Sequence, residues 1–303
     1  MNEVLSLFDL DFPAYFQGPG LLVALAGFGL LVGVLTGLFG VGGGFLITPL
    51  LRVAFGVPYL LAIGSGLSFT IGTSSSGASR HLRLGNIEPR CMLILAATSM
   101  VATVAGATLN GFLENALGKD NHTVMMHILF IVMLSITAWL VARNRPPHRS
   151  GKSLLQRFPL GPRIDLPRAK LTGVSLPGIC VVGLLIGLLK GMMGIGGGVV
   201  FMPLLILVVG LTPHQAVGTS LGVVIFSSIA GASKYALTGN VNLCIVMALL
   251  VSSVFGVQIG AFICSRLHGA RLRKYFALVV LLTVVVLAAD LAVKLLGARA
   301  QGA

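Results

Sequence analysis

The sequence is poor in charged side chains, and in acidic ones above all. Only 10% of its 303 residues are charged, and 8 acidic residues stand against 21 basic ones. Soluble domains carry about 25% charged residues, so this composition excludes an ordinary soluble domain. The four cysteines show no CxxC and no Cys/His spacing, which argues against a metal or redox site. We therefore expect no metal and no cofactor.

Long apolar segments are what the sequence has in abundance. Its mean hydropathy is +0.99, and 56% of its residues are hydrophobic. Apolar runs of about 20 residues, long enough to cross a bilayer core, recur along the chain. They predict an all-α polytopic membrane protein, because the strands of a β-barrel would alternate polar and apolar residues. The runs are Leu21–Phe39, Leu60–Ser79, Cys91–Phe112, Val124–Val141, Val174–Leu189, Ala216–Ala236, Leu243–Cys264 and Tyr275–Leu296.

The basic excess gives a net charge of +13, yet its distribution argues against nucleic-acid binding. The Lys and Arg residues sit in short loops between apolar runs, where the positive-inside effect places them. The linker at residues 142–173 is basic and rich in proline, so we expect it in the cytoplasm. The expected partner is a lipid bilayer, and the expected location is the cytoplasmic membrane, as a multi-pass protein.

A glycine cluster occurs twice. Residues 37–51 read GLFGVGGGFLITPLL, and residues 191–205 read GMMGIGGGVVFMPLL. The offset from Gly40 to Gly194 is 154 residues, and it holds without a gap far beyond the clusters. The chain is therefore divided into two homologous halves, residues 21–141 and 174–296. An N-terminal segment (1–20), the linker and a C-terminal tail (297–303) complete it.

Matching loops of the two halves differ in charge. Arg80–Arg90 is basic, whereas its counterpart Lys234–Asn242 holds one basic residue. The bias reverses in the next pair, where Arg266–Lys274 is basic and Leu113–Thr123 is not. This pattern predicts an inverted-topology repeat, as in many secondary transporters. We expect 8–10 transmembrane helices with a Gly-rich helix break in each half; whether the segments beside the glycines cross fully or re-enter stays open.

The repeated GxxGxGGGxxxxPxL signature, the two-half layout and the size resemble the TauE/SafE family of sulfite and organosulfonate exporters, also called TSUP. The resemblance covers nearly the whole chain, from about Leu21 to Leu296. It implies a transporter of small anions such as sulfite or an organosulfonate. The family is broad, so the resemblance does not fix the substrate.

The glycine clusters are the expected substrate site. A helix break exposes backbone N–H groups at the positive end of the next helix, where anions bind. Tight helix contact through small residues is the competing explanation. Lys190 lies within an apolar run, and its repeat partner is Thr36; it is the expected charged contact, with snorkelling to an interface as its alternative. The expected substrate-binding residues are Gly40, Gly42, Gly43, Gly44, Pro49, Ser74, Lys190, Gly194, Gly196, Gly197, Gly198, Pro203 and Ser228.

The function expected from these features is secondary transport of a small anion, with export as the expected direction, by alternating access. No GxxxxGK[ST] motif occurs, so the polypeptide does not hydrolyse ATP. An anion channel with a glycine-loop filter and a carrier of small carboxylates are the alternatives; an enzyme is not expected. The sparse intramembrane acids argue against a carboxylate proton relay, and Asp290 is expected to pair with Lys294 at i,i+4. The coupling ion and a homodimer remain open.

Overall fold

The computed structural model describes residues 19–39, 42–143, 154–157, 161–196, 198–266 and 269–301. It is mostly helical, and six of the described helices are long and apolar enough to cross a membrane. The prediction of a multi-pass helical membrane protein is thereby confirmed. The six candidate spans are Pro89–Leu117, Lys119–Trp139, Leu176–Met193, Pro213–Leu237, Leu243–Gly260 and Tyr275–Lys294.

The two halves contain helical elements in the same order. The first half comprises α2 (Pro19–Phe39), α3 (Gly44–Phe55), α4 (Tyr59–Arg83), α5 (Pro89–Leu117) and α6 (Lys119–Arg143). The second comprises α8 (Leu176–Met193), α9 (Gly198–Leu204) with the π-helix η2 (Leu205–Val209), α10 (Pro213–Leu237), α11 (Leu243–Arg266) and α12 (Gly269–Gln301). Proline in the first turn favours the starts of α5, α8 and α10, since the missing N–H is not needed there.

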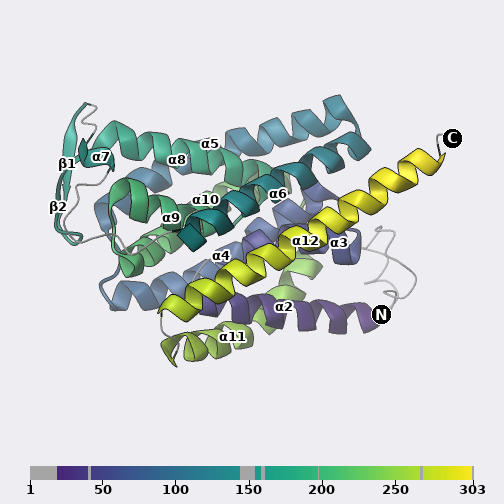
Figure 1. Ribbon diagram of the computed structural model, residues 1–303, viewed down its shortest axis with the longest axis horizontal. Helices are drawn as coiled ribbons and strands as arrows, with labels where there is room; N and C mark the ends of the chain where they lie inside the picture. Colours follow the sequence, from purple (N-terminus) through teal and green to yellow (C-terminus); the bar gives the residue numbers. More distant parts are fainter. Residues whose placement is uncertain are drawn as a thin grey trace.

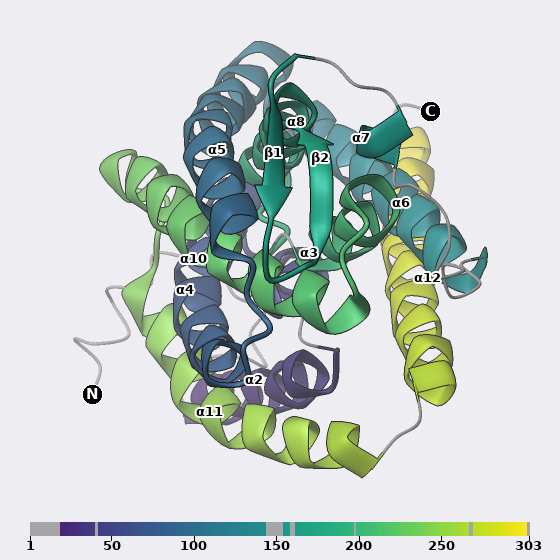
Figure 2. The ribbon, with the colours of Figure 1, turned by 90° about the vertical axis from the view of Figure 1, so that its left-hand side faces the viewer.

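The linker contains structure that the sequence analysis did not predict. A short helix, α7 (Leu154–Arg157), precedes an antiparallel pair of strands, β1 (Arg163–Leu166) and β2 (Leu171–Ser175). The expectation of an all-α chain is therefore wrong in this region. The hairpin lies at one end of the helical bundle (Figures 1 and 2). The Glu88 carboxylate, just before α5, accepts a hydrogen bond from Ala169 N at 2.9 Å and fixes the hairpin there.

The first helix of each half packs on a helix of the other half. Helix α2 lies beside α11, and α8 lies beside α5 (Figure 1). A methyl group added at Gly33 would lie 2.5 Å from Ser253 O, and one added at Gly187 would lie 2.6 Å from Ser99 O. Both glycines thus permit the close backbone approach typical of membrane helices. The two contacts are related by the same offset as the glycine clusters.

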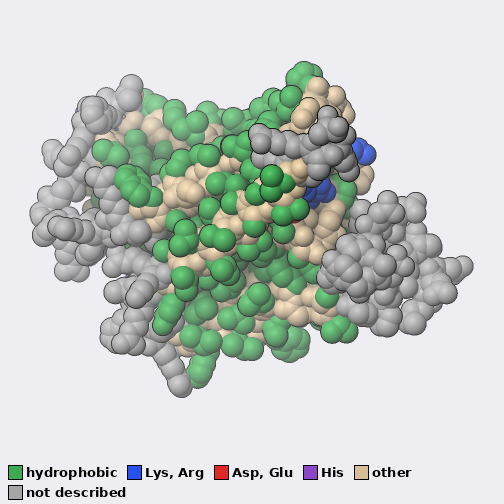
Figure 3. Space-filling model, turned by 45° about the vertical axis from the view of Figure 1, so that its right-hand side comes forward, with side chains coloured by type: hydrophobic (Ala, Val, Ile, Leu, Met, Phe, Trp, Pro, Cys, Tyr) green, Lys and Arg blue, Asp and Glu red, His purple; other side chains and the backbone are tan. Residues whose placement is uncertain are grey.

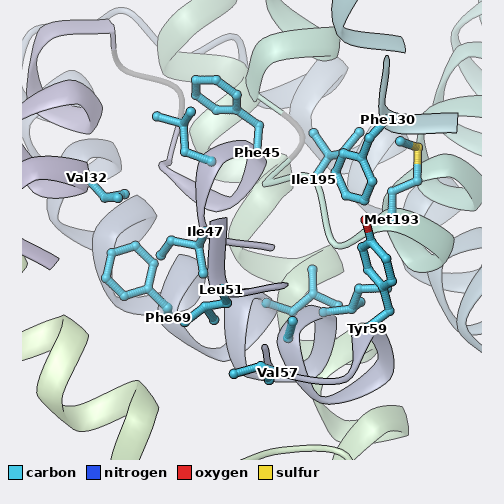
Figure 4. Close-up of a cluster of buried hydrophobic side chains, with 14 of the residues drawn as sticks. Val32, Phe45, Ile47, Leu51, Val57, Tyr59, Phe69, Phe130, Met193 and Ile195 are labelled. Carbon is cyan, nitrogen blue, oxygen red and sulfur yellow. The ribbon is translucent and has the colours of Figure 1, made fainter. Parts of the chain in front are cut away.

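The interior and the exterior are both apolar. Phe45 and Ile47 of α3 share a buried cluster with Met193 and Ile195 of the second glycine segment (Figure 4). Apolar side chains are also widespread over the part of the surface coloured in Figure 3, and Phe255, for example, is 65% exposed. An apolar exterior of this extent fits a protein surrounded by lipid rather than water.

Candidate functional site

The first glycine segment joins two helices that do not continue into each other. Helix α2 ends at Phe39 and α3 begins at Gly44. Gly42 and Gly43 have φ angles of 76° and 74°, a left-handed conformation that residues with a Cβ atom rarely adopt. Leu46 N and Ile47 N both donate to Gly43 O, so the N–H groups of Gly44 and Phe45 have no acceptor within the helix.

The second glycine segment has a related geometry. Helix α8 ends at Met193, and Gly194 caps it with a φ of 65° and a hydrogen bond from its N–H to Lys190 O at 2.8 Å. Helix α9 begins at Gly198. It passes Pro203 and changes to the π-helix η2 at Leu205, whereas α3 stays α-helical through Pro49. Proline removes a backbone donor in both helices.

The two glycine segments touch. A methyl group added at Gly44 would lie 2.6 Å from Gly196 N, and one added at Gly196 would lie 2.9 Å from Gly44 N. Contacts this short leave no room for any side chain. The two glycine segments, which are 154 residues apart in the sequence, therefore meet inside the protein. The first residue of α3, Gly44, lies at their contact.

Hydroxyl groups surround this meeting point. A methyl group at Gly42 would lie 2.8 Å from Ser74 Oγ, one at Gly194 would lie 2.8 Å from Thr48 Oγ1, and one at Gly43 would overlap Thr36 Oγ1. Within the described chain, these three hydroxyls have no hydrogen-bond partner, and neither do those of Thr103 and Ser228. Leaving a buried hydroxyl unsatisfied is unfavourable by about 1–3 kcal/mol, so such a group is a natural place for a ligand.

Lys190 is fully enclosed, with 1% of its surface exposed. Its Nζ donates to Val224 O at 2.9 Å and to Ser227 Oγ at 2.6 Å, both on α10. The ion pairs among the described residues are His127–Asp290 and Lys294–Asp290, so no described carboxylate neutralises Lys190. The burial also contradicts the alternative of snorkelling, which requires the ammonium group to reach water.

Several of the expected site residues come together, and others do not. Gly42, Gly43, Gly44, Gly196 and Ser74 form one contact region, and Pro49 is buried within α3. Lys190 lies one turn before Gly194 and points to α10. Ser228 is buried beside Ser227, on that same helix. Gly198 and Pro203 lie in α9. Gly40 and Gly197 lie outside the described residues.

Three hydroxyl residues of this region were missing from the predicted site: Thr36, Thr48 and Thr103. Thr36 could have been found, because it is the repeat partner of Lys190 and therefore occupies the matching turn of α2. Thr48 and Thr103 have no hydroxyl counterpart in the repeat, where Met202 and Val257 stand. Only the fold brings Thr48 to Gly194.

Comparison with known proteins adds independent information. The family model described as sulfite exporter TauE/SafE matches residues 25–287. Among similar proteins, the probable membrane transporter protein YunE of Bacillus subtilis is 26% identical over 255 residues, covering 81% of this chain and 89% of the relative.

Two further relatives extend the comparison. The probable membrane transporter protein YdhB of Bacillus subtilis is 28% identical over 231 residues, covering 76% of this chain and 85% of that protein. The probable membrane transporter protein MJ0441 of Methanocaldococcus jannaschii is 28% identical over 261 residues, covering 81% and 87%. No solved structure matches the chain significantly.

Proposed function

Because the chain belongs to the sulfite exporter TauE/SafE family, we propose that it carries a small anion, such as sulfite or an organosulfonate, across the cytoplasmic membrane by alternating access. It is a multi-pass membrane transporter and not an enzyme.

The observation that carries the proposal is the complete burial of the Lys190 amino group without a described carboxylate partner. Burying an ion in a low-dielectric interior costs several kcal/mol unless an opposite charge compensates it. Lys190 has only a carbonyl and a hydroxyl as partners. A bound anion would supply the missing charge, and the unsatisfied hydroxyls of Ser74 and Ser228 would serve as neutral donors to its oxygen atoms. Neutral donors hold an oxyanion without the desolvation cost of a second full charge.

The start of α3 supports the same site. The N–H groups of Gly44 and Phe45 have no intrahelical acceptor, and the positive end of the helix dipole lies there. Glycine at Gly42 and Gly43 lets a ligand approach the backbone closely. We therefore propose that the glycine segments are functional helix breaks, in which an anion is bound between the two halves.

Matched contacts between the halves support an inverted repeat. Ser65 Oγ accepts a hydrogen bond from Asn242 N, and its repeat partner Thr219 Oγ accepts one from Glu88 N. These two bonds interchange under the repeat offset, as expected for halves related by an approximate twofold axis. We propose an odd number of crossings in each half, ten in all if the segments beside the glycines cross fully, with the linker on the cytoplasmic side and both termini on the other.

Reconstitution in liposomes tests the function. Sulfite, organosulfonates and small carboxylates would be offered separately under imposed pH and voltage gradients. Saturable uptake or exchange of one of these anions is expected, and single-channel currents would favour the channel instead. If no small anion moved while the purified protein remained folded, the proposed function would be wrong.

A further inference from the structure

A second group of ionisable side chains lies apart from the glycine segments, where α6 meets α12. His127 Nε2 lies 2.8 Å from Asp290 Oδ2, and Lys294 Nζ lies 2.8 Å from the same oxygen. The predicted pairing of Asp290 with Lys294 is thus confirmed, but the sequence gave no sign of His127 as a third member. His127 is fully buried, whereas the Asp290 and Lys294 side chains are 23% and 35% exposed. The Asp290 carboxylate therefore connects a buried imidazole with the exterior.

The surroundings of His127 determine where its protons are. Its Nδ1 lies 2.8 Å from the carbonyl oxygen of Thr123, which can only accept a hydrogen bond. Nδ1 could also accept from Tyr59 OH, 3.2 Å away, but the shorter contact with Thr123 O favours a hydrogen on Nδ1. A neutral imidazole would then present a lone pair on Nε2 to the Asp290 oxygen, which is a repulsive contact at 2.8 Å. With that hydrogen on Nδ1, the close approach of Nε2 to Asp290 favours one additional proton in the His127–Asp290 pair.

Other ionisable side chains lie around the His127–Asp290 pair. Lys294 on α12 shares the Asp290 oxygen. Tyr59, the first residue of α4, places its hydroxyl 3.2 Å from His127 Nδ1. The ring of Tyr59 also meets the edge of His122, and the Arg52 guanidinium lies 5.8 Å from its centroid. Because Lys294 and Arg52 are positive, loss of the additional proton would leave the carboxylate held by Lys294 and would release the imidazole.

The ring of Tyr59 packs edge-to-face with that of His122, and from His122 a chain of buried polar contacts leads to the second glycine segment. His122 Nε2 lies 2.8 Å from Asn110 Oδ1, and Asn110 Nδ2 donates to Tyr235 OH at 3.0 Å. Tyr235 OH in turn donates to Gly191 O at 2.8 Å, one turn or less from Lys190 and Gly194. The Asn110 amide does not relay protons, so this chain transmits position rather than a proton.

The group breaks the repeat. The positions that match His127, Asp290 and Lys294 in the other half are Leu281, Ile136 and Leu140. Tyr59 and His122 correspond to Pro213 and Phe276. Because the repeat-related positions hold apolar residues, the ionisable group occurs at only one of the two places that the repeat relates. The contact of Gly33 with Ser253 and that of Gly187 with Ser99, by contrast, are related by the repeat.

From these observations, we propose that His127 and Asp290, with Lys294, form a proton-binding site that couples anion transport to the proton gradient. Protonation forms the imidazolium–carboxylate contact that holds α12 against α6 and the start of α4. Deprotonation weakens that contact, and the polar chain through Tyr235 carries the change to the second glycine segment. The coupling rests on the proposed transport function, whereas the bound proton does not. The proposed site uses one carboxylate, that of Asp290, together with His127, and so differs from a proton relay built of several acidic residues.

The bound proton is measured without any substrate. Protein labelled with 15N-histidine in lipid nanodiscs at pH 7 would be studied by solid-state NMR, and the His127→Gln variant would identify the His127 signals. We expect both ring nitrogens of His127 to carry hydrogen in the wild type. In Asp290→Asn we expect a neutral ring with hydrogen on Nδ1 only, held by Thr123 O. A neutral His127 ring in the wild type would refute the proton site.

The coupling is measured in liposomes that contain a pH-sensitive dye. Ethanesulfonate is a suitable probe, because it stays ionised over the pH range used and carries no proton of its own. With the voltage clamped, we expect a gradient of one pH unit to drive about tenfold accumulation for one proton per anion. Asp290→Asn should lose this accumulation and keep exchange of ethanesulfonate at equal pH. Asp120→Asn, the same change at an exposed position at the start of α6, should keep both.

The two assays separate the two proposals. Accumulation by Asp290→Asn equal to that of the wild type would overturn the coupling, even if NMR found the proton. If the wild type did not transport ethanesulfonate, both transport of this probe and its coupling to the proton gradient would be refuted. The NMR result would then decide the proton site alone. The sign of the dye response distinguishes protons that move with the anion from protons that move against it.

Discussion

Replacing Lys190 with Met distinguishes a substrate-binding role from a structural one. Met keeps most of the side-chain length and removes the charge. Burying an ammonium ion costs several kcal/mol, and its hydrogen bonds to Val224 O and Ser227 Oγ offset only part of that. Ser227 Oγ keeps its hydrogen bond to Val223 O at 2.9 Å, so the substitution does not leave this hydroxyl without a partner. We expect the free energy of unfolding to stay within about 1 kcal/mol or to rise.

Anion binding should respond in the opposite direction. A hydrogen bond between charged groups contributes about 1.5–3 kcal/mol, which corresponds to a loss of affinity of about 10-fold to 150-fold. The apparent affinity would be measured by exchange of a labelled sulfonate in liposomes, and stability by circular dichroism during heating. Lys119→Met, the same change at an exposed position at the start of α6, is the control and should alter neither quantity.

The result that would refute this reasoning is a variant with unchanged affinity and lower stability. Lys190 would then be a structural residue that ties α8 to α10 through Ser227. Loss of both properties would show that the ammonium group is neutralised within the protein itself. Only a stable variant with weakened binding agrees with an anion that completes the charge of the site.

Four further substitutions, with two comparison variants, test other parts of the structure. Ser74→Ala and Ser228→Ala should each weaken sulfonate exchange roughly twofold to tenfold. Neither should lose thermal stability, because their hydroxyls have no described partner. Ser65→Ala removes the acceptor of Asn242 N and should instead lower the free energy of unfolding by about 1 kcal/mol. Gly44→Ala should abolish transport and lower the melting temperature, since the new Cβ would lie 2.6 Å from Gly196 N. Gly27→Ala is the control: its Cβ would have no neighbouring heavy atom within 4 Å, so the variant should be neutral or slightly stabilising in the same assays. Tyr235→Phe should lower the free energy of unfolding by about 1–3 kcal/mol in a denaturant titration, because Gly191 O loses its donor and Asn110 loses its acceptor. An unchanged denaturation midpoint would show that the polar chain is not formed.

Much of the fold could be predicted from the sequence, because apolar length and the repeat both act over many residues. The apolar runs predict the six candidate spans, and the register that aligns Gly40 with Gly194 also aligns α2 with α8. The hairpin of the linker escaped prediction for a physical reason. Its strands are 4 and 5 residues long, too short for their alternation to stand out among prolines and charges.

The candidate site was predictable where it depends on local chemistry and hidden where it depends on packing. Gly42 and Gly43 were expected in a break, since four clustered glycines disfavour a helix. The partners of Lys190 could not be inferred, because Ser227 lies 37 residues away on another helix. The same applies to His127 and Asp290, which meet only because α6 and α12 pack together. Proximity in the sequence therefore identified Lys294 as a partner of Asp290 and could not identify His127.

The crosswise packing of α2 on α11 has a consequence for how the protein is made. Helix α2 leaves the ribosome first among the described helices, and the partner that covers Gly29 and Gly33 is synthesised more than 200 residues later. Helix α5, by contrast, is already in the membrane when α8 emerges. During biogenesis, the first half must therefore hold an uncovered glycine face in lipid until the second half arrives. A chain that stops before Leu243 would expose that face permanently, which would mark it for quality control.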